Sequence, residues 1–115
     1  MRLRGSQVTT IAGSTTGYAD GFALSAMFSD PNAVATDAGG NIFISDYQNN
    51  RIRRIDWLTR MVSTVAGSGK NGVVNAMGTL AQFNGPYGLT MYNGSIYLVD
   101  LLGDTVRNIG MVEFY

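Results

Sequence analysis

The sequence predicts an all-β chain made of two copies of one four-stranded antiparallel unit. Three observations support this prediction: a long internal repeat, short apolar runs of strand length, and glycine-rich turns between these runs. Glycine accounts for 15 of the 115 residues, whereas proline occurs only 2 times. This composition suits a chain of tight turns, because glycine readily adopts the positive φ angles that such turns require.

The repeat extends over almost the whole chain at an offset of 54 or 55 residues. The segment VTTIAGS at residues 8–14 recurs as VSTVAGS at residues 62–68. The pairs at an offset of 55 are Gly17 with Gly72, Ala26 with Ala81, Phe28 with Phe83, and Pro31 with Pro86. The later pairs, again at an offset of 54, are Ile42 with Ile96, Asp46 with Asp100, Arg53 with Arg107, and Ile55 with Ile109. Both changes of offset fall in turns, as expected of a structural repeat.

Each copy contains four predicted strands. They cover residues 33–36, 42–45, 52–55 and 62–66 in the first copy, and residues 88–91, 96–99, 106–109 and a weaker 111–115 in the second. The second strand of each copy is apolar without alternation, which predicts that both faces of each sheet are buried. The turns at residues 37–41 and 93–94 contain Asp, Asn and Gly, which suit tight hairpins. Phe28 and Phe83 are expected to plug the core.

A repeated four-stranded meander that is buried on both faces is the blade of a β-propeller. The segment GYADGFALSAMFSDPNAVATDAGGNIFISDYQNNRIRRI resembles an Asn-His-Leu (NHL) repeat through its A-x-F-x-x-P motif, its D-x-x-G-N turn and its apolar strand ending in Asp. Asn49-Asn50-Arg51-Ile52 occupies the N-H-R-I-like motif, with Asn50 at the histidine position. The second copy departs further, with Gly103-Asp104-Thr105-Val106 there. The resemblance covers residues 8 to 109 and implies a propeller fold rather than one particular activity.

These patterns divide the chain into an N-terminal tail at residues 1–7, an orphan outer strand at 8–12, a first blade with its leading loop at 13–66, and a second blade with its leading loop at 67–115. Two blades alone would expose two apolar faces. The chain is therefore expected to be a fragment of a longer propeller or to be completed by oligomerisation, with three chains forming a ring of about six blades as the favoured assembly. The orphan strand, with Val8, Thr10, Ile11 and Ala12 as its assembly residues, is hypothesised to be exchanged between subunits.

One end of the predicted blades gathers the longest loops, and binding residues tend to lie on such loops. The candidate residues of this binding face are Tyr18, Asp20, Asp46, Tyr47, Gln48, Asn49, Asn50, Arg51, Asp100 and Asp104. A structural interpretation stays open beside the functional one, because Asp46 and Asp100 would also suit the capping of turns. The repetition of Arg53 as Arg107 further indicates a structural salt bridge, with Asp30, Asp46 and Asp56 as available partners.

The amino-acid composition excludes several common kinds of catalytic site. The chain has no histidine and no cysteine, which excludes a Ser-His-Asp triad, thiolate zinc sites and disulfides. No catalytic residue, metal ligand or cofactor is predicted. Eight basic and eight acidic residues give zero formal net charge, which argues against a nucleic-acid or membrane surface. The sequence therefore predicts a non-catalytic module for binding or assembly, whose partner is another protein, another copy of the chain or the remaining blades of a longer chain.

Two alternatives stay open. Propellers that resemble this one include calcium-dependent lactonases and lyases, and Asp20, Asp46 and Asp100 could supply hard oxygen ligands. Others bind RNA, for which Arg51, Arg53, Arg54 and Arg60 would be the candidates. The start of the chain lacks the apolar core of a signal peptide, and no run has the length of a membrane span. The compartment is left open, with the cytoplasm slightly favoured.

Overall fold

The computed structural model describes residues 5–110, and the prediction of an all-β chain is confirmed there. The first antiparallel sheet contains β1 (Gly21–Phe22), β2 (Pro31–Thr36), β3 (Ile42–Asp46), β4 (Arg51–Ile55) and β5 (Met61–Ala66), and the second contains β6 (Pro86–Tyr92), β7 (Ser95–Asp100) and β8 (Thr105–Gly110). Three 3-10 turns, η1 (Ala23–Ser25), η2 (Tyr47–Asn49) and η3 (Gly78–Leu80), complete the regular structure. None of the described helices is long and apolar enough to cross a membrane.

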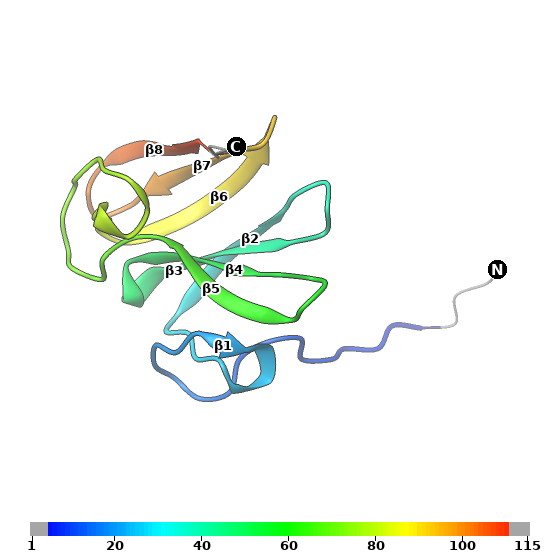
Figure 1. The fold of residues 1–115 in the computed structure, drawn as a ribbon. Helices are drawn as coiled ribbons and strands as arrows, with labels where there is room; N and C mark the ends of the chain where they lie inside the picture. The colour runs from blue at the N-terminus through cyan, green and yellow to red at the C-terminus, as the bar shows by residue number, and fades with distance from the viewer. Residues whose placement is uncertain (1–4, 111–115) are drawn as a thin grey trace.

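Each sheet is a meander, as the repeat predicts (Figure 1). The order is β1-β5-β4-β3-β2 in the first sheet and β6-β7-β8 in the second. Each of the seven strands predicted between residues 33 and 109 lies inside an observed strand. The eighth prediction, residues 111–115, lies outside the described residues. Short strands are well predicted here because the turns that bound them carry strong local signals.

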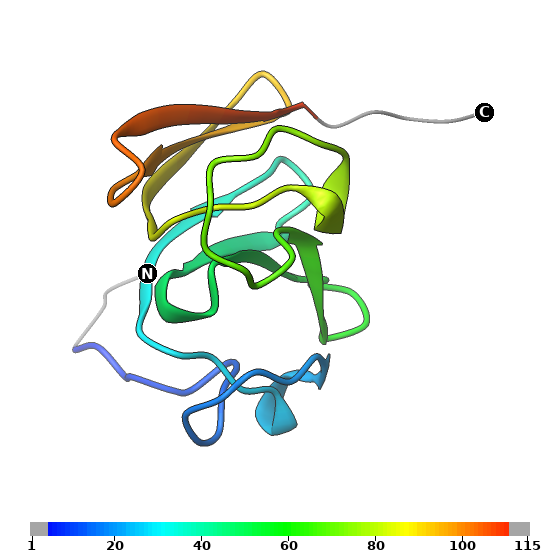
Figure 2. The same ribbon diagram turned by 90° about the vertical axis from the view of Figure 1, so that its left-hand side faces the viewer.

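The two sheets pack face to face as consecutive blades, and the loop leading into the second blade runs alongside both (Figure 2). The core between the blades consists of Phe43, Ile52 and Ala66 from the first, and Phe83, Ile96 and Leu98 from the second. A second cluster, on the other face of the first blade, consists of Ala23, Ala26, Ile44, Ile55 and Val62. The prediction that both faces of the sheet are buried is met at the second strand of the first blade, where Phe43 and Ile44 are 2% and 6% exposed. It is wrong for the second blade, where Tyr97 and Val99 are 41% and 44% exposed because no further blade covers them.

The two repeat-related phenylalanines differ in burial. Phe83 is only 2% exposed between the two blades, as predicted. Phe28 occupies the matching position before the first blade, and it is only half-buried against the second cluster. The difference follows from packing, because Phe83 has a blade on each side and Phe28 has one.

The prediction of a strand at residues 8–12 is not met within one chain. In the described part of the chain this segment has no strand assignment and pairs with no sheet. The reason is that this segment corresponds to the outer strand of a further blade, and the described residues form only two sheets. The outer edge of the first sheet is covered by β1, which the sequence did not predict and which pairs with β5. Val8 is consequently 95% exposed.

The β2–β3 turn is held by Asp37. Its Oδ1 accepts hydrogen bonds from the backbone N–H groups of Gly39 and Asn41, each at 2.9 Å, and its Oδ2 accepts one from the Asn41 side chain at 3.1 Å. Desolvation by itself raises the pKa of Asp37, but these hydrogen bonds together outweigh it and lower the pKa below the ordinary value of 3.8. The ionised carboxylate therefore stabilises this turn.

Candidate functional site

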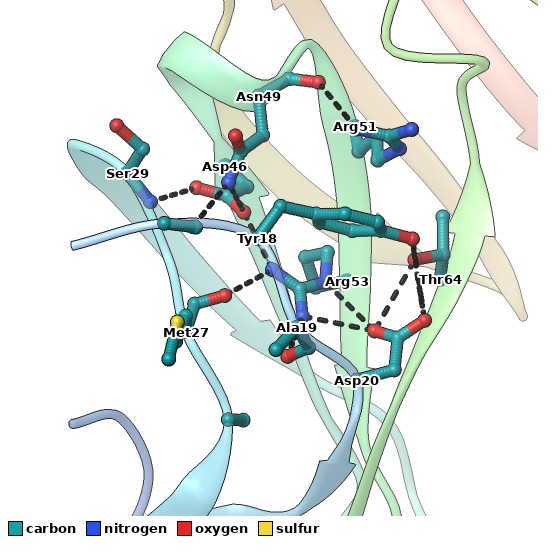
Figure 3. A network of polar contacts seen from close by, with 12 residues as sticks. Tyr18, Ala19, Asp20, Met27, Ser29, Asp46, Asn49, Arg51, Arg53 and Thr64 are labelled. Carbon is teal, nitrogen blue, oxygen red and sulfur yellow. Dashed lines mark hydrogen bonds and ion pairs between the residues drawn. The ribbon is translucent and has the colours of Figure 1, made fainter. Parts of the chain in front are cut away.

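Arg53 is the centre of a polar network beneath the loops at one end of the blades (Figure 3). Its side chain is 0% exposed. Nη1 donates to Asp46 Oδ2 at 2.6 Å and to the Met27 carbonyl at 2.8 Å. Nη2 donates to Asp20 Oδ1 at 2.9 Å and to the Ala19 carbonyl at 2.7 Å, and Nε also donates to Asp20. All the guanidinium donors are thus satisfied, and they tie the leading loop of the first blade to its sheet.

Asp46 is a structural residue of this network. Its side chain is also 0% exposed. Besides the bond from Arg53, it accepts hydrogen bonds at 2.8 Å from the Ser29 backbone N–H and from the Asn49 side chain. The expected salt bridge of Arg53 is confirmed, with Asp46 as the buried partner. Asp46 thus accepts three hydrogen bonds within the chain, and its burial closes it to a ligand from solvent.

The second blade repeats the arrangement with one change of charge. Arg107 Nη1 donates to Asp100 Oδ2 at 2.8 Å, and Nη2 donates to the Val74 carbonyl at 3.0 Å and to Asn75 Oδ1 at 3.1 Å. Asn75 thus replaces Asp20, its repeat mate. The first blade surrounds its arginine with two carboxylates, whereas the second uses one carboxylate and one amide.

An aromatic corner lies on the solvent side of the Arg53 network (Figure 3). The Tyr18 hydroxyl donates to the Thr64 hydroxyl at 2.6 Å, and the Thr64 hydroxyl in turn donates to Asp20 Oδ2 at 3.0 Å. The Arg51 guanidinium lies 3.8 Å from the centre of the Tyr18 ring, which places a cation over an aromatic face. Tyr18 remains 41% exposed, so this corner is open to a partner.

Asn50, at the position of the NHL histidine, fastens the two blades together. It adopts a left-handed conformation with φ 52° and ψ 43°, which asparagine tolerates better than most residues. Its side-chain nitrogen donates to Asn71 Oδ1, and its side-chain oxygen accepts the Gly85 N–H at 2.8 Å. Asn50 is therefore engaged within the chain and is only 8% exposed.

The structure divides the predicted binding face into surface and buried residues. The exposed or half-buried residues are Tyr18, Asp20, Tyr47, Gln48, Asn49, Arg51 and Asp104. The buried residues are Asp46, Asn50 and Asp100. The buried residues cannot meet a partner, because their polar atoms are used inside the chain. We call the exposed or half-buried set the loop face.

Three residues next to the loop face were not predicted. The ring of Tyr87 meets that of Tyr47 edge to face at a centroid distance of 6.0 Å. Leu101 and Leu102 are 42% and 59% exposed. These leucines are the repeat mates of Tyr47 and Gln48 at an offset of 54, so the repeat could have identified them. They make this part of the surface apolar.

Most of the charged residues that were candidates for calcium or RNA binding form contacts within the chain. Within residues 5–110 no group of three or more His, Cys, Asp or Glu side chains is arranged to hold a metal ion. Asp46 and Asp100 lie in different blades, each paired with its own arginine. Among the arginines proposed for RNA, Arg53 is buried, and Arg60 stacks on Trp57 at 3.4 Å from the ring centre.

Both outer faces of the blade pair are apolar and open. Tyr97 and Val106, on the outer side of the second blade, are 41% and 77% exposed. Their repeat mates Phe43 and Ile52 are 2% and 0% exposed, because the second blade covers them. We call the outer side of the second blade, with Tyr97, Val99 and Val106, the second-blade open face.

The outer side of the first blade is open in the same way. Val34 is 66% exposed, whereas its repeat mate Leu89 packs against the core between the blades. A shallow groove on this side is lined by Ile11, Ala12, Phe28, Pro31, Val34, Ile42, Ile44 and Ile55. We call this surface the first-blade open face.

Comparison with known proteins agrees with the repeat seen in the sequence. The NHL repeat model matches residues 28–55. The chain is 30% identical over 93 residues to Protein SUPPRESSOR OF QUENCHING 1, chloroplastic, of Arabidopsis thaliana, covering 80% of the chain and 9% of that protein. It is 39% identical over 72 residues to NHL repeat-containing protein 2 of Gallus gallus, covering 62% of the chain and 10% of that protein. The chain thus spans about a tenth of the length of these relatives.

Solved structures share the fold. A Bacteroides thetaiotaomicron protein of unknown function matches with a TM-score of 0.80 and 29% identity, over 84% of this chain and 26% of that one. An auxiliary nutrient binding protein from the same organism matches with a TM-score of 0.75 and 20% identity, over 87% of this chain and 28% of that one. The second likeness concerns the fold alone.

The family follows from sequence and structure together. The matched repeat, the relatives named for NHL repeats, and the two packed antiparallel blades are three findings that agree. The chain belongs to the NHL-repeat family of β-propellers.

Proposed function

We propose that this chain is a non-catalytic propeller module that acts by binding. Its two open blade faces take further blades, and its loop face takes a protein partner. The observation that carries the proposal is the contrast between Ile52, 0% exposed, and its repeat mate Val106, 77% exposed. The same position is a core residue in one blade and surface in the other, so the second blade presents a surface shaped for another blade.

Copies of the chain itself are the favoured source of those blades. The second-blade open face and the first-blade open face are the two sides of one repeating contact, so copies would associate head to tail. Propellers close with about 4 to 8 blades, and three copies would give six. The remaining blades of a longer chain would cover the same two faces. The relatives are long enough to supply them, because the chain matches only about a tenth of their length.

The native mass tests this proposal. The chain has a mass of 12.3 kDa, so size-exclusion chromatography with light scattering is expected to give three times that value. Val106→Asp places a charge in the contact and is expected to give the monomer mass. Leu58→Asp is the matched control, because Leu58 is 93% exposed in a turn away from both open faces. A folded wild-type monomer at all concentrations would contradict self-assembly.

The loop face suits a protein partner better than a catalytic reaction. It combines the exposed Tyr18 ring and the Tyr47–Tyr87 pair with polar side chains such as Gln48, a mixture that is common in protein interfaces. Calcium distinguishes the enzymatic alternative. A melting temperature that stays constant up to millimolar calcium agrees with a binding module, whereas a rise would favour a calcium-dependent propeller enzyme.

A further inference from the structure

The second blade has a groove along the outer edge of β8. It has a volume of about 360 Å³. Its lining includes Asn75, Ala76 and Met77 on one side and Arg107, Asn108 and Ile109 on the other. Among the described residues no strand pairs with this edge of β8, so the backbone groups facing the groove are available to a further strand.

The first blade shows what such a groove holds. There β5 lies between β4 and β1 and pairs with both. At the repeat offsets, β4 corresponds to β8, and Gly21–Phe22 corresponds to residues 76–77, which line the opposite wall of the groove. The groove therefore lies between the equivalents of β4 and β1, and the strand that would fill it is the equivalent of β5.

We propose that residues 8–12 of a second copy of this chain fill the groove and complete the second blade, in place of residues 111–115, whose sequence is a poorer match to VSTVA. This inference rests on the self-assembly proposed above and names the segment that joins the copies. The sequence of residues 8–12, VTTIA, closely matches VSTVA at residues 62–66, the segment that fills the equivalent position in the first blade. The segment is also available, since Val8 is 95% and Ile11 45% exposed.

The chain leaves residues 8–12 by the same path as it leaves β5. The Gly13 N–H donates to the Ala23 carbonyl at 2.9 Å, and its repeat mate Gly67 donates to the Gly78 carbonyl at 3.2 Å. The chain thus enters the first blade at Gly13 as it enters the second at Gly67, and Ile11 and Ala12 line the first-blade open face. This end of the segment lies where the outer strand of a blade packed on that face would end.

The repeat also predicts the register. In the first blade Ser63 pairs with Arg54 and Thr64 pairs with Arg53. Shifted by 54 residues, these pairs become Thr9 of the second copy with Asn108 of the first, and Thr10 of the second copy with Arg107 of the first. The Thr64 hydroxyl donates to Asp20, whose repeat mate is Asn75. We therefore expect the Thr10 hydroxyl to meet the Asn75 side chain.

The proposed exchange would cover both open faces at once. If residues 8–12 of the next copy form the outer strand of the second blade of this copy, that second blade must pack on the first-blade open face of the next copy. Its exposed Tyr97 and Val106 would then face Val34 and Phe28, the residues left uncovered there. Within one chain the described N-terminal segment leaves the first sheet on the side away from β8, so an exchange between copies is needed (Figure 1).

A disulfide introduced into this cysteine-free chain tests the register. Facing residues of antiparallel strands have Cα atoms about 4.5–5.5 Å apart, a separation that disulfides bridge. The variant Thr9→Cys with Asn108→Cys is expected to form covalent dimers and higher multimers under mild oxidation. The matched control is Thr9→Cys with Thr90→Cys, because Thr90 is exposed on β6, at the opposite edge of the same sheet.

The outcomes separate strand exchange from self-assembly. Multimers linked through residues 9 and 108, and absent from the control, support the proposal. A wild type that assembles but gives no more linked product than the control overturns strand exchange and leaves the assembly through blade faces standing. A wild type that is monomeric overturns both.

A proline substitution provides a second, independent test. Thr10→Pro removes a backbone N–H from the proposed strand and is expected to weaken assembly about tenfold or more. Ser6→Pro, just before the segment, is expected to assemble like the wild type. Residues 8–12 pair with no sheet in the single chain, so at concentrations at which the copies are dissociated both variants should show the β-sheet circular dichroism of the wild type. Assembly of Thr10→Pro at wild-type strength would refute the proposal.

Discussion

The buried ion pair of the first blade offers the sharpest test of what holds the leading loop to the sheet. Replacing Arg53 by methionine keeps a long side chain and removes every donor. Asp46 would then remain buried without its partner, and the carbonyls of Ala19 and Met27 would each lose a hydrogen bond. Asp20 would suffer less, because its side chain is 38% exposed and can be hydrated.

The expected loss is large. Removing one partner of a buried pair costs about 3–5 kcal/mol, since the remaining charge has neither water nor a counter-ion. For a domain of this size each kcal/mol corresponds to about 4 °C in melting temperature, which gives a fall of about 12–20 °C. Arg53→Met with Asp46→Asn removes both charges and is expected to recover part of this loss, because an amide is easier to bury than a carboxylate.

The assay is thermal unfolding followed by circular dichroism, with Arg54→Met as the matched control. Arg54 lies next to Arg53 in β4, but it pairs with Asp56 at 3.4 Å and both side chains are 32% exposed. An ion pair of this kind contributes little to stability. If Arg53→Met melts within about 3 °C of Arg54→Met, the buried pair does not hold the loop as argued.

Three further predictions concern packing and turns. Gly67→Ala should melt several degrees below Gly94→Ala in calorimetry, because both glycines have positive φ but a Cβ at Gly67 would meet a backbone oxygen at 2.5 Å, whereas nothing lies within 4 Å at Gly94. Phe83→Ala should lower the free energy of unfolding by about 3–5 kcal/mol in urea titrations, and Phe28→Ala by less, because Phe28 is only half-buried. Because the pKa of Asp37 is lowered in the folded chain, its stabilising effect is present above its ordinary value of 3.8 and is lost as the pH falls through the folded value. Asp37→Asn should therefore be less stable than the wild type at pH 7, with a difference that shrinks as the pH falls below 3.8, and equal stability at pH 7 would contradict this account.

Much of the fold could be predicted from local patterns. The offsets of 54 and 55 residues identified two equivalent units, and the turn residues Asn93 and Gly94 have φ angles of 51° and 80°, as a tight hairpin requires. A salt bridge of Arg53 was expected from the same repeat, with Asp46 among three available partners, and the structure pairs Arg53 with Asp46 and also with Asp20, which was not expected. These features are predictable because each depends on residues close in sequence or repeated at a fixed spacing.

The candidate site was predicted less completely. Asp100 ends a strand next to a long loop, a position that suits both a binding residue and a buried partner. Only the three-dimensional fold shows that Arg107 reaches across to it and that its side chain is 0% exposed. Tyr87 was missed because its repeat mate is Asn32, so the repeat carried no aromatic signal at that position. Whether a side chain meets solvent depends on residues brought near by folding.

Local sequence patterns were enough to identify an all-β chain of two NHL-type blades that lacks the histidine and cysteine of many catalytic sites. Tertiary structure decided which copies of each repeated residue are buried. Phe43 and Tyr97 occupy the same place in their blades, yet one is 2% and the other 41% exposed. A blade buries a face only where another blade covers it, and that neighbour is a property of the assembled fold rather than of the local sequence.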